Sequence, residues 1–546
     1  MTTGKQVRGK KWIQLICLLA ISAPAMFVFG SAQAEGGEPR EGHFAAPDMP
    51  AFNANVTTGA AAVTPGFYQT SEYLIGRVAV GLILPESDGS SETELSDWTP
   101  EQRQRVLDEV TQGLNWWARQ APEAQLTFVV DDRATAPLAT GYEPITHPQY
   151  EEGLWIGDTL SQLGYTNGSY WTRVRNYVND LRRVHHTDWA FAIFVVNSAG
   201  DADAAFTDNY FAYAYIGGPF LVMTYDNAGY NIDNMDAVTA HETGHVFRAL
   251  DQYPGANVAC TSRSGYLGIE TQNSQRSGCA SNVSSIMRGG IAPYLTRSID
   301  PYARGQVGWR DSDTDGIFDP VDTIPTLTVG PATETEGTWL YSGRAADVPY
   351  PSTTRPAATI NHVSVEYSVN GGAWTATTPA DGSFDSANEE FSLTLQPTTS
   401  GNHRIALRAL NAVGNVSDSA NFVAVVPDPI DGGLDTWLEP PAAGLPGGDG
   451  ASALHGVASS FNADSTPGAI VARVEYRVNG GGWRAAQPHD GAFDSAEEGF
   501  TVSLDGWGGR YQVEARAIDA NGKAEQNLAA LEVEANYAVF VPFMQK

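Results

Sequence analysis

Two histidines and a glutamate have the spacing of a catalytic metal site in the segment His241-Glu242-x-x-His245. On a helix, residues four apart lie on one face, so the two imidazoles can bind one Zn²⁺ together. Glu242 then lies beside the ion, where a carboxylate can take a proton from an activated water. The segment therefore predicts a zinc site with ligands His241 and His245 and general base Glu242. A surface helix that carries these residues by chance is the alternative.

A catalytic zinc site uses three protein ligands, and Asp251 is the best third candidate. If the helix continued, Asp251 would lie about 240° around the axis from His245 and would miss the zinc face. We therefore expect the helix to end between about Arg248 and Leu250. Glu270 is the rival third ligand.

The segment His241–Tyr253 resembles the metzincin motif HExxHxxGxxH in its Asp-ending variant. It is also similar to the bacterial metallopeptidase family named for immunoglobulin-A cleavage. Ser285-Ile286-Met287-Arg288 looks like the Met-turn, which would place Met287 as an apolar floor beneath the zinc. The resemblance covers about residues 76–322 and implies hydrolysis of peptide bonds. The chain departs from the two patterns at Arg248, where metzincins have Gly, and at Gln252, where the second family usually has an acid.

Residues 211–225 predict a strand directly before the metal-binding helix, interrupted near the cleft by Gly217-Gly218-Pro219. The resemblance implies that this is the edge strand along which an extended peptide substrate forms main-chain hydrogen bonds. An ordinary core strand is the alternative. Tyr253 or Tyr294 could polarise the scissile carbonyl, although a packing role is the more common one for a tyrosine.

A second candidate metal site lies in the segment 311–322, which has the spacing of a twelve-residue calcium loop. Position 12 is Asp instead of the usual Glu, and the alternative is a solvated acidic turn. The segment nevertheless predicts a Ca²⁺ site at the end of the catalytic region. Its expected ligands are Asp311, Asp313, Asp315, the carbonyl of Ile317, Asp319 and Asp322.

The N-terminus has the composition of an export signal. Four basic residues precede an apolar run from Trp12 to Phe29, and Ala32-Gln33-Ala34 follows as a small-x-small cleavage site. We expect a secreted protein with signal peptide 1–34 and no membrane span in the mature chain, the alternative being a membrane anchor. Cys260 and Cys279 are then the remaining cysteines. In an exported protein they predict a disulfide, with two metal ligands as the alternative.

The organisation of the chain predicts several domains. Residues 35–75 lack periodicity and read as a flexible lead-in or short pro-segment, and strands then alternate with helices through residue 250. In the C-terminal part, residues 365–374 and 381–387 recur at a constant separation of 109 residues, with Asn-Gly as a hairpin turn. We expect an α/β metzincin-like catalytic domain (76–324) followed by two all-β immunoglobulin-like or fibronectin-like sandwiches (325–427 and 434–540).

The leading functional hypothesis is a secreted zinc endopeptidase that acts on extracellular proteins or peptides. The alternatives are an adhesive extracellular protein with a vestigial metal helix and a zinc hydrolase of a non-peptide bond. A formal net charge of −31 and the lack of a clustered basic patch argue against a nucleic-acid partner. The sequence leaves the substrate and the oligomeric state open.

Overall fold

The computed structural model describes residues 39–50, 64–93, 95–335, 337–397, 401–426, 433–439, 445–446, 452–462, 466–504 and 509–536. The expected signal peptide, residues 1–34, lies outside these ranges, as does most of the linker expected between the two repeats. No helix within the described ranges combines the length and the apolar character needed to cross a membrane.

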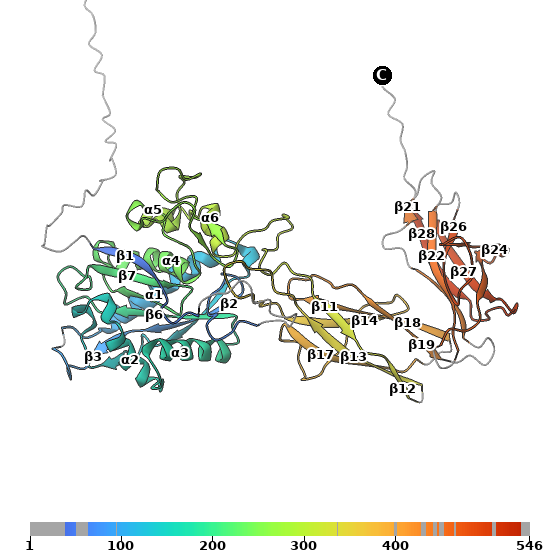
Figure 1. Ribbon diagram of the computed structural model, residues 1–546, viewed down its shortest axis with the longest axis horizontal. Helices are drawn as coiled ribbons and strands as arrows, with labels where there is room; N and C mark the ends of the chain where they lie inside the picture. Colours follow the sequence, from blue (N-terminus) through green and yellow to red (C-terminus); the bar gives the residue numbers. More distant parts are fainter. Residues whose placement is uncertain are drawn as a thin grey trace, which may run out of the picture. The chain divides into compact units, whose positions relative to one another are not determined.

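A six-stranded sheet organises the N-terminal half of the protein, in the strand order β1-β7-β8-β6-β2-β4 (Figure 1). Strands β2, β4, β6 and β8 are mutually parallel, β7 runs antiparallel to β8, and β1 runs parallel to β7. All eight residues of β6 are buried, as expected for a strand covered on both faces. The bounds are β1 Arg40–Ala45, β2 Arg77–Ile83, β4 Thr127–Asp132, β6 Trp189–Val196, β7 Tyr210–Ile216 and β8 Phe220–Thr224.

Helices cover both faces of this sheet. Helices α1 (Pro100–Ala118) and α4 (Met235–Val246) pack on one face, and α2 (Gly153–Gln162) and α3 (Tyr170–Val184) contribute to a separate core on the other. Trp117 of α1 is fully buried and donates a 2.8 Å hydrogen bond to the carbonyl oxygen of Ala240 in α4. The two helices of the first face are therefore fixed against each other at the level of the predicted metal site.

The described parts of the lead-in, residues 39–50 and 64–75, differ from the flexible segment that the sequence predicts. Strand β1 lies within it, and Tyr73 and Leu74 are completely buried in the core beneath the sheet. The six residues of β1 pair with a strand about 170 positions later in the chain. A short segment that gains its order from so distant a partner has too little local pattern to be recognised.

The strand predicted at residues 211–225 is interrupted at Gly217-Gly218-Pro219, as the sequence predicts, and forms two strands, β7 and β8. Gly217 and Gly218 separate them with positive φ angles of 81° and 72°, a backbone conformation that glycine adopts without a steric penalty. The outer edge of β7 was expected to be exposed, but β1 is paired along it from Arg40 to Ala45. The expectation of an open edge strand is therefore corrected.

The C-terminal part is all-β, and each of its two regions has two sheets around its own core. The first region contains the sheets β11-β13-β17-β16 and β15-β14-β18-β19, and the second contains β20-β22-β26-β25 and β21-β28-β27-β23-β24. The bounds in the first are β11 Thr326–Val329, β12 Thr333–Thr335, β13 Thr338–Ala346, β14 Val363–Val369, β15 Thr375–Ala376, β16 Thr378–Pro379, β17 Asn388–Leu395, β18 Gly401–Asn411 and β19 Ala420–Val426. Those in the second are β20 Leu434–Leu438, β21 Leu445–Pro446, β22 Ser452–Ser460, β23 Val471–Val478, β24 Arg484–Ala485, β25 Gln487–Pro488, β26 Glu497–Leu504, β27 Gly509–Asp519 and β28 Ala529–Asn536.

The duplicated sequence gives the same local structure in both regions. Asn370 and Gly371 have φ angles of 51° and 70°, and Asn479 and Gly480 have 49° and 68°, as a tight hairpin turn requires. The tryptophan after each turn packs under arginine: Arg408 lies 4.0 Å from the ring centroid of Trp374, and Arg516 lies 4.1 Å from that of Trp483. The turns and their tryptophans therefore have a structural role within each sandwich.

Candidate metal centre

The backbone fixes the orientation of both predicted histidine ligands. His241 and His245 are buried on α4, one helical turn apart. The Nδ1 atom of His241 lies 2.9 Å from the carbonyl oxygen of Ile286, and that of His245 lies 2.8 Å from the carbonyl oxygen of Ala249. Because a carbonyl can only accept, each Nδ1 carries the proton and each Nε2 presents its lone pair.

Asp251 joins the two histidines at one point. Its Oδ1 atom lies 3.0 Å from Nε2 of His241 and 3.2 Å from Nε2 of His245, and the two Nε2 atoms are 3.1 Å apart. Three electron-rich atoms at these distances repel one another unless a proton or a metal cation lies among them. Ligands of a tetrahedral zinc ion, bound at 2.0–2.2 Å, are about 3.3–3.6 Å from one another, so the three atoms need only a small expansion.

The donor types also discriminate between metals. Two neutral imidazoles and one carboxylate suit zinc and related transition metals, whereas Ca²⁺ and Mg²⁺ prefer sites made of oxygen ligands. Asp251 is itself held from outside the cluster, since its Oδ2 atom lies 2.6 Å from Nδ1 of His43. A carboxylate that is oriented in this way by an outer partner is typical of metal centres.

Glu242 is completely buried next to the cluster, and neither of its carboxylate oxygens has a hydrogen-bond partner. Burying a carboxylate without a partner costs folding free energy, so such a group indicates a place where a ligand or a reacting group binds. Ligand atoms of Glu242, His241 and Glu41 lie within 4.8 Å of one another. The position suits a general base that meets a water molecule close to a metal.

The end of α4 brings Asp251 back to the histidines. The last helical residue is Val246, the amide of Arg248 donates to the carbonyl of His245, and the amide of Ala249 donates to that of Gly244. This is the hydrogen-bond pattern of a Schellman motif, in which the residue at the position of Arg248 takes a left-handed conformation. Arg248 does so with a φ of 75°. The helix thus ends slightly before the residue range expected from sequence, and an arginine occupies the place that glycine fills most easily.

Met287, the candidate Met-turn residue, lies against α4. It is fully buried, and a Cβ added at Gly244 would lie only 2.6 Å from its sulfur, so this helix position has no room for a side chain. The carbonyl of Met287 accepts a 2.7 Å hydrogen bond from the amide of Gln252. The segment around Met287 therefore supports both the helix and the loop that carries Asp251.

Gln252 belongs to a fully buried polar network. Its side-chain amide donates to Oδ2 of Asp300 at 2.8 Å, and its Oε1 accepts from Asn273 at 2.8 Å. Both ends of the amide are therefore used. Because Asp300 already supplies a carboxylate beside this side chain, a neutral amide fits at position 252.

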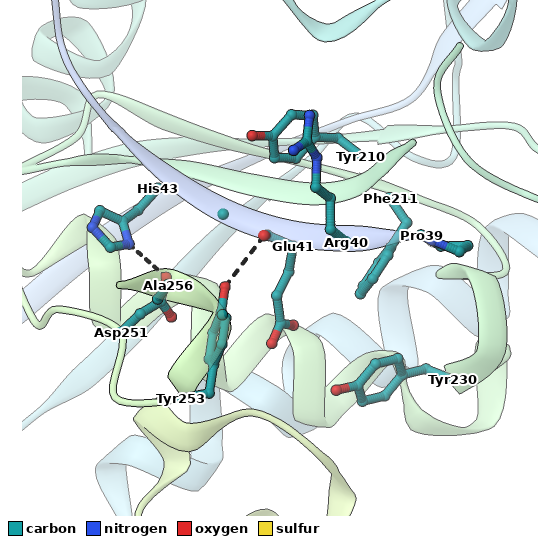
Figure 2. A pocket seen from close by; sticks show the side chains of 12 residues that line it. Pro39, Arg40, Glu41, His43, Tyr210, Phe211, Tyr230, Asp251, Tyr253 and Ala256 are labelled. Carbon is teal, nitrogen blue, oxygen red and sulfur yellow. Dashed lines mark hydrogen bonds and ion pairs between the residues drawn. The ribbon is translucent and has the colours of Figure 1, made fainter. Parts of the chain in front are cut away.

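Two residues of the site were missed by the sequence reasoning, Glu41 and His43 of β1. The carboxylate oxygen Oε1 of Glu41 lies 4.0 Å from Nε2 of His241, and the imidazole of His43 contacts Asp251 as described. Figure 2 shows both side chains pointing from β1 toward the loop that carries Asp251 and Tyr253. The alternation of Glu41 and His43 along a strand is the available signal, and it is informative only once the pairing of β1 is known.

A cavity of about 570 Å³ opens beside the cluster, between β1 and the loop after α4 (Figure 2). Tyr253 lines it, and its hydroxyl donates to the main-chain oxygen of Glu41 at 3.3 Å. Tyr230, which the sequence did not single out, also lines the cavity. Tyr294 is not among the lining residues and instead stacks on Trp116.

Glu270, the rival zinc ligand, is engaged elsewhere. Its carboxylate pairs with Arg263 at 2.7 Å and accepts from Gln272 at 2.9 Å. It lies on the short strand β10 (Ile269–Glu270) and belongs to none of the possible ligand groups among the described residues. The assignment of Asp251 is therefore the one that agrees with the geometry.

Cys260 and Cys279 form a disulfide, as the sequence predicts.

The acidic loop is only partly organised as a calcium site. Carboxylates of Asp311, Asp313 and Asp315 lie within 4.8 Å of one another. By contrast, Asp319 pairs with Arg310 at 2.5 Å and accepts from Ser312, and Asp322 accepts from Asn415 at 2.8 Å. The structure thus brings together three of the expected carboxylates. Calcium binding by this loop stays a prediction.

Burial and neighbouring charges both shift the pKa values of the ionisable groups of the centre. Burial raises the pKa of Glu242 well above its usual range, and the carboxylates of Glu41 and Asp251 add to the shift against the opposing effect of His241. Burial also favours the neutral form of Asp251, but the nearby imidazoles outweigh it and hold the pKa of Asp251 well below its usual range. For His245 burial dominates and lowers the pKa to about 4.

Comparisons with known proteins leave the family open. No protein-family model and no curated protein matches the chain. Among solved structures, the fibronectin(III)-like modules of CbhA from Clostridium thermocellum match with 12% identity over 41% of this chain and 100% of theirs, with a TM-score of 0.15. The D00–D0 domain of intimin matches with 16% identity over 39% of this chain and 97% of that chain, with a TM-score of 0.14.

Proposed function

We propose that this protein is a zinc-dependent hydrolase, and more specifically a metzincin-like endopeptidase that acts on extracellular proteins or peptides. The single observation that carries the proposal is the convergence of Nε2 of His241, Nε2 of His245 and Oδ1 of Asp251 within 3.2 Å of one another beside the unpaired carboxylate of Glu242. The expected secretion signal supports the extracellular setting of the substrate.

The residues of the centre comprise three candidate metal ligands and one candidate general base. His241, His245 and Asp251 would hold the metal, with the two imidazoles fixed by the carbonyls of Ile286 and Ala249. Zn²⁺ at this place supplies Lewis-acid polarisation of the scissile carbonyl and activation of a water. Glu242 then accepts a proton from the attacking water and delivers it to the leaving amine.

The surroundings of the centre favour a peptide substrate. Strand β1 is itself an extended chain that pairs with β7 directly beside the cluster, which shows that β7 can form main-chain hydrogen bonds with an extended segment at this place. Tyr253 lines the adjacent cavity and has its hydroxyl close to a peptide carbonyl, that of Glu41. This contact supports a role for Tyr253 in binding the scissile carbonyl.

Metal analysis combined with digestion of a proteome-derived peptide library tests the proposal. We expect one bound zinc per chain in the wild type and in Glu242→Gln, and a loss of zinc in Asp251→Asn. Glu242→Gln should lower the cleavage rate by about 10²–10⁴-fold, because it keeps the shape of the side chain and removes the general base. Glu270→Gln, in the rejected ligand, is the matched control and should keep both zinc and activity. Equal cleavage by wild type and Glu242→Gln, or a wild type without zinc, would contradict the proposal.

A further inference from the structure

The loop closed by the disulfide, residues 260–279, reaches the chain segment that carries the third candidate ligand. Asn273 of this disulfide loop is completely buried. Its Nδ2 atom donates a 2.8 Å hydrogen bond to Oε1 of Gln252, the residue directly after Asp251. The main-chain amide of Gln275 also donates, at 2.9 Å, to the main-chain oxygen of Gln252. The disulfide loop therefore contacts both the side chain and the main chain of Gln252.

Both polar atoms of the Asn273 side chain are fully used. Besides the bond to Gln252, Nδ2 donates to the main-chain oxygen of Val283 at 3.0 Å. Oδ1 accepts from the amide of Val283 and from the hydroxyl of Ser281, both at 2.9 Å, and from Nη2 of Arg288 at 3.2 Å. An amide with partners at its nitrogen and at its oxygen cannot turn over without losing hydrogen bonds on both sides. Asn273 therefore has one defined orientation, with a donor facing Gln252.

The contacts of Gln252 fix the main chain next to Asp251. The amide nitrogen of Gln252 belongs to the same peptide group as the carbonyl of Asp251, and it donates to the carbonyl of Met287 at 2.7 Å. The next peptide group along the chain is held by the bond from Gln275. Because a peptide group is planar, holding these two groups fixes the direction in which the chain leaves Asp251.

A displacement at this place would act directly on the metal centre. The two histidines lie on α4, whereas Asp251 lies on the loop after it, so the relative position of helix and loop decides whether the three ligand atoms converge. Arg288, which directly follows Met287 beneath α4, also donates to the main-chain oxygen of Asn273 at 2.9 Å. Asn273 thus connects the loop that carries Asp251 with the segment that supports the histidine helix.

We propose that Asn273 is a positioning residue for the metal centre, which holds Asp251 at the two histidines through Gln252. This inference rests on the proposed function, because it names a group that shapes the ligand set of the same site. The disulfide restricts the loop from which Asn273 projects, and so keeps the amide in place. Zinc binding therefore depends on a side chain that is not itself a ligand.

Two substitutions at position 273 test the inference. Asn273→Asp keeps the shape of the side chain and its accepting oxygen, but replaces the donor to Gln252 by a second oxygen. The Kd for zinc, measured by competition with a chelator, should rise by at least about tenfold. This is the lower end of the range for outer partners of metal ligands, because Asn273 acts through one further residue. Asn273→Ala should give the same direction of change, and it replaces Asn273→Asp should that variant fail to fold.

Asn361→Ala is the matched control for Asn273→Ala. Asn361 is also a buried amide, and it donates to the carbonyl of Val321 at 2.8 Å and to the hydroxyl of Thr323 at 3.0 Å, neither of which belongs to the metal centre. The control should be less stable than the wild type in urea and keep the wild-type Kd for zinc. An equal rise of Kd in the control would overturn the inference, because any lost buried amide would then have the same effect.

A spectroscopic measurement reports the arrangement of the ligands without reference to activity. With Co²⁺ in place of zinc, Asn273→Asp should change the visible absorption spectrum of the wild type, whereas Asn361→Ala should leave it unchanged. A folded Asn273→Asp variant with the wild-type spectrum and the wild-type Kd would overturn the positioning role.

A compensating substitution tests the route through Gln252. With a second oxygen at position 273, the Gln252 amide can turn over and donate to it, provided that Asp300 no longer requires the same donor. Asp300→Asn supplies a donor to the turned amide and restores the net charge of the network. The variant with both substitutions should therefore bind zinc more tightly than Asn273→Asp alone. Additive losses would show that Gln252 does not transmit the effect, and would overturn the inference.

The outcomes separate the inference from the function on which it rests. A raised Kd in Asn273→Asp, together with Glu242-dependent cleavage by the wild type, supports both. A wild-type Kd in Asn273→Asp overturns the positioning role and leaves the proposed function standing. A raised Kd without cleavage of any peptide by the zinc-loaded wild type overturns the proposed peptidase and leaves Asn273 as a positioning residue of a metal site. A wild type that binds no zinc overturns both.

Discussion

Arg248 ends helix α4 in a left-handed conformation while its guanidinium contacts the buried carboxylate of Glu72, with Nη2 3.2 Å from Oε1 and Nε 3.1 Å from Oε2. A non-glycine residue in this conformation costs about 1 kcal/mol or more. Arg355 contacts the same carboxylate at 2.9 Å, so Glu72 lies between two arginines. The turn that places Asp251 at the histidines is therefore held from its outer side by an ion-pair cluster.

Removal of the charge at the centre of this cluster should destabilise the fold. Glu72→Gln leaves two arginine side chains, of which Arg248 is nearly fully buried, without their counter-charge. We expect the free energy of unfolding in urea to fall by about 3–5 kcal/mol. Glu270→Gln removes a more exposed partner of Arg263 and should cost less than about 1 kcal/mol. A similar loss in the two variants would show that burial does not determine the strength of the Glu72 cluster.

The same cluster predicts a pH dependence with a definite sign. Burial favours the neutral form of Glu72, but Arg248 and Arg355 outweigh it, so the pKa of Glu72 is lowered from 4.5 in the folded protein. A lowered folded pKa means that the stabilisation is present above about pH 4.5 and disappears as the pH falls through the folded value. The difference in unfolding free energy between wild type and Glu72→Gln should therefore shrink on acidification below pH 4.5. Urea unfolding from pH 7 to pH 3 measures it, and a difference that grows on acidification would contradict the assigned charges.

The position of Gln252 gives a prediction about the acid that related motifs carry there. Gln252→Glu would place a second carboxylate against Oδ2 of Asp300, which lies 2.8 Å from the present amide nitrogen. Because both groups are buried, we expect a loss of about 3 kcal/mol in unfolding free energy, measured by urea titration.

A second substitution should reverse that loss. Asp300→Asn supplies an amide donor to the introduced carboxylate and keeps a side-chain oxygen for the amides of Tyr302 and Ala303, which Asp300 now caps. The double variant should therefore be more stable than Gln252→Glu alone. Additive losses in the double variant would show that the two side chains do not interact as described.

The parts of the site that the sequence predicted are those encoded by local spacing. His241, Glu242 and His245 follow from the helical repeat, and the return of Asp251 follows from the requirement that the helix end before it. Met287 was expected through resemblance of a short motif. The disulfide between Cys260 and Cys279 was expected because these two cysteines remain once the predicted export signal is removed.

The parts that were missed depend on contacts between distant segments. His43 meets Asp251 across 208 positions, and Arg248 meets Glu72 across 176. Neither β1 nor the residues around Glu72 has a long periodic pattern, because each gains its structure by packing on elements formed elsewhere. The split of residues 211–225 into β7 and β8 falls at Gly217-Gly218-Pro219, where the sequence already predicts an interruption of the strand.

The acidic loop provides a final prediction. It distinguishes the full set of calcium ligands expected from the sequence from the three carboxylates that the structure brings together. In the structure Asp313 lies in the group with Asp311 and Asp315, whereas the oxygens of Asp319 are used by Arg310 and Ser312. Carboxylates of Asp315, Asp322 and Asp311 also raise the pKa of Asp313 beyond the effect of local desolvation, so a cation would relieve their mutual repulsion. Extracellular calcium modules bind with Kd of about 10⁻⁴–10⁻³ M, so about 10 mM Ca²⁺ is at least about tenfold above Kd.

At that concentration Ca²⁺ should stabilise the wild type by about 1.4 kcal/mol or more, measured as a rise in Tm at constant zinc. Asp313→Asn should abolish the rise, because it removes one of the three converging carboxylates. Asp319→Asn should lower Tm in the absence of calcium, through its contacts with Arg310 and Ser312, yet retain the calcium-dependent rise. Loss of the rise in Asp319→Asn would instead favour the full ligand set expected from the sequence. A wild type with no rise would reject the loop as a calcium site, since its three carboxylates then do not gain from a cation.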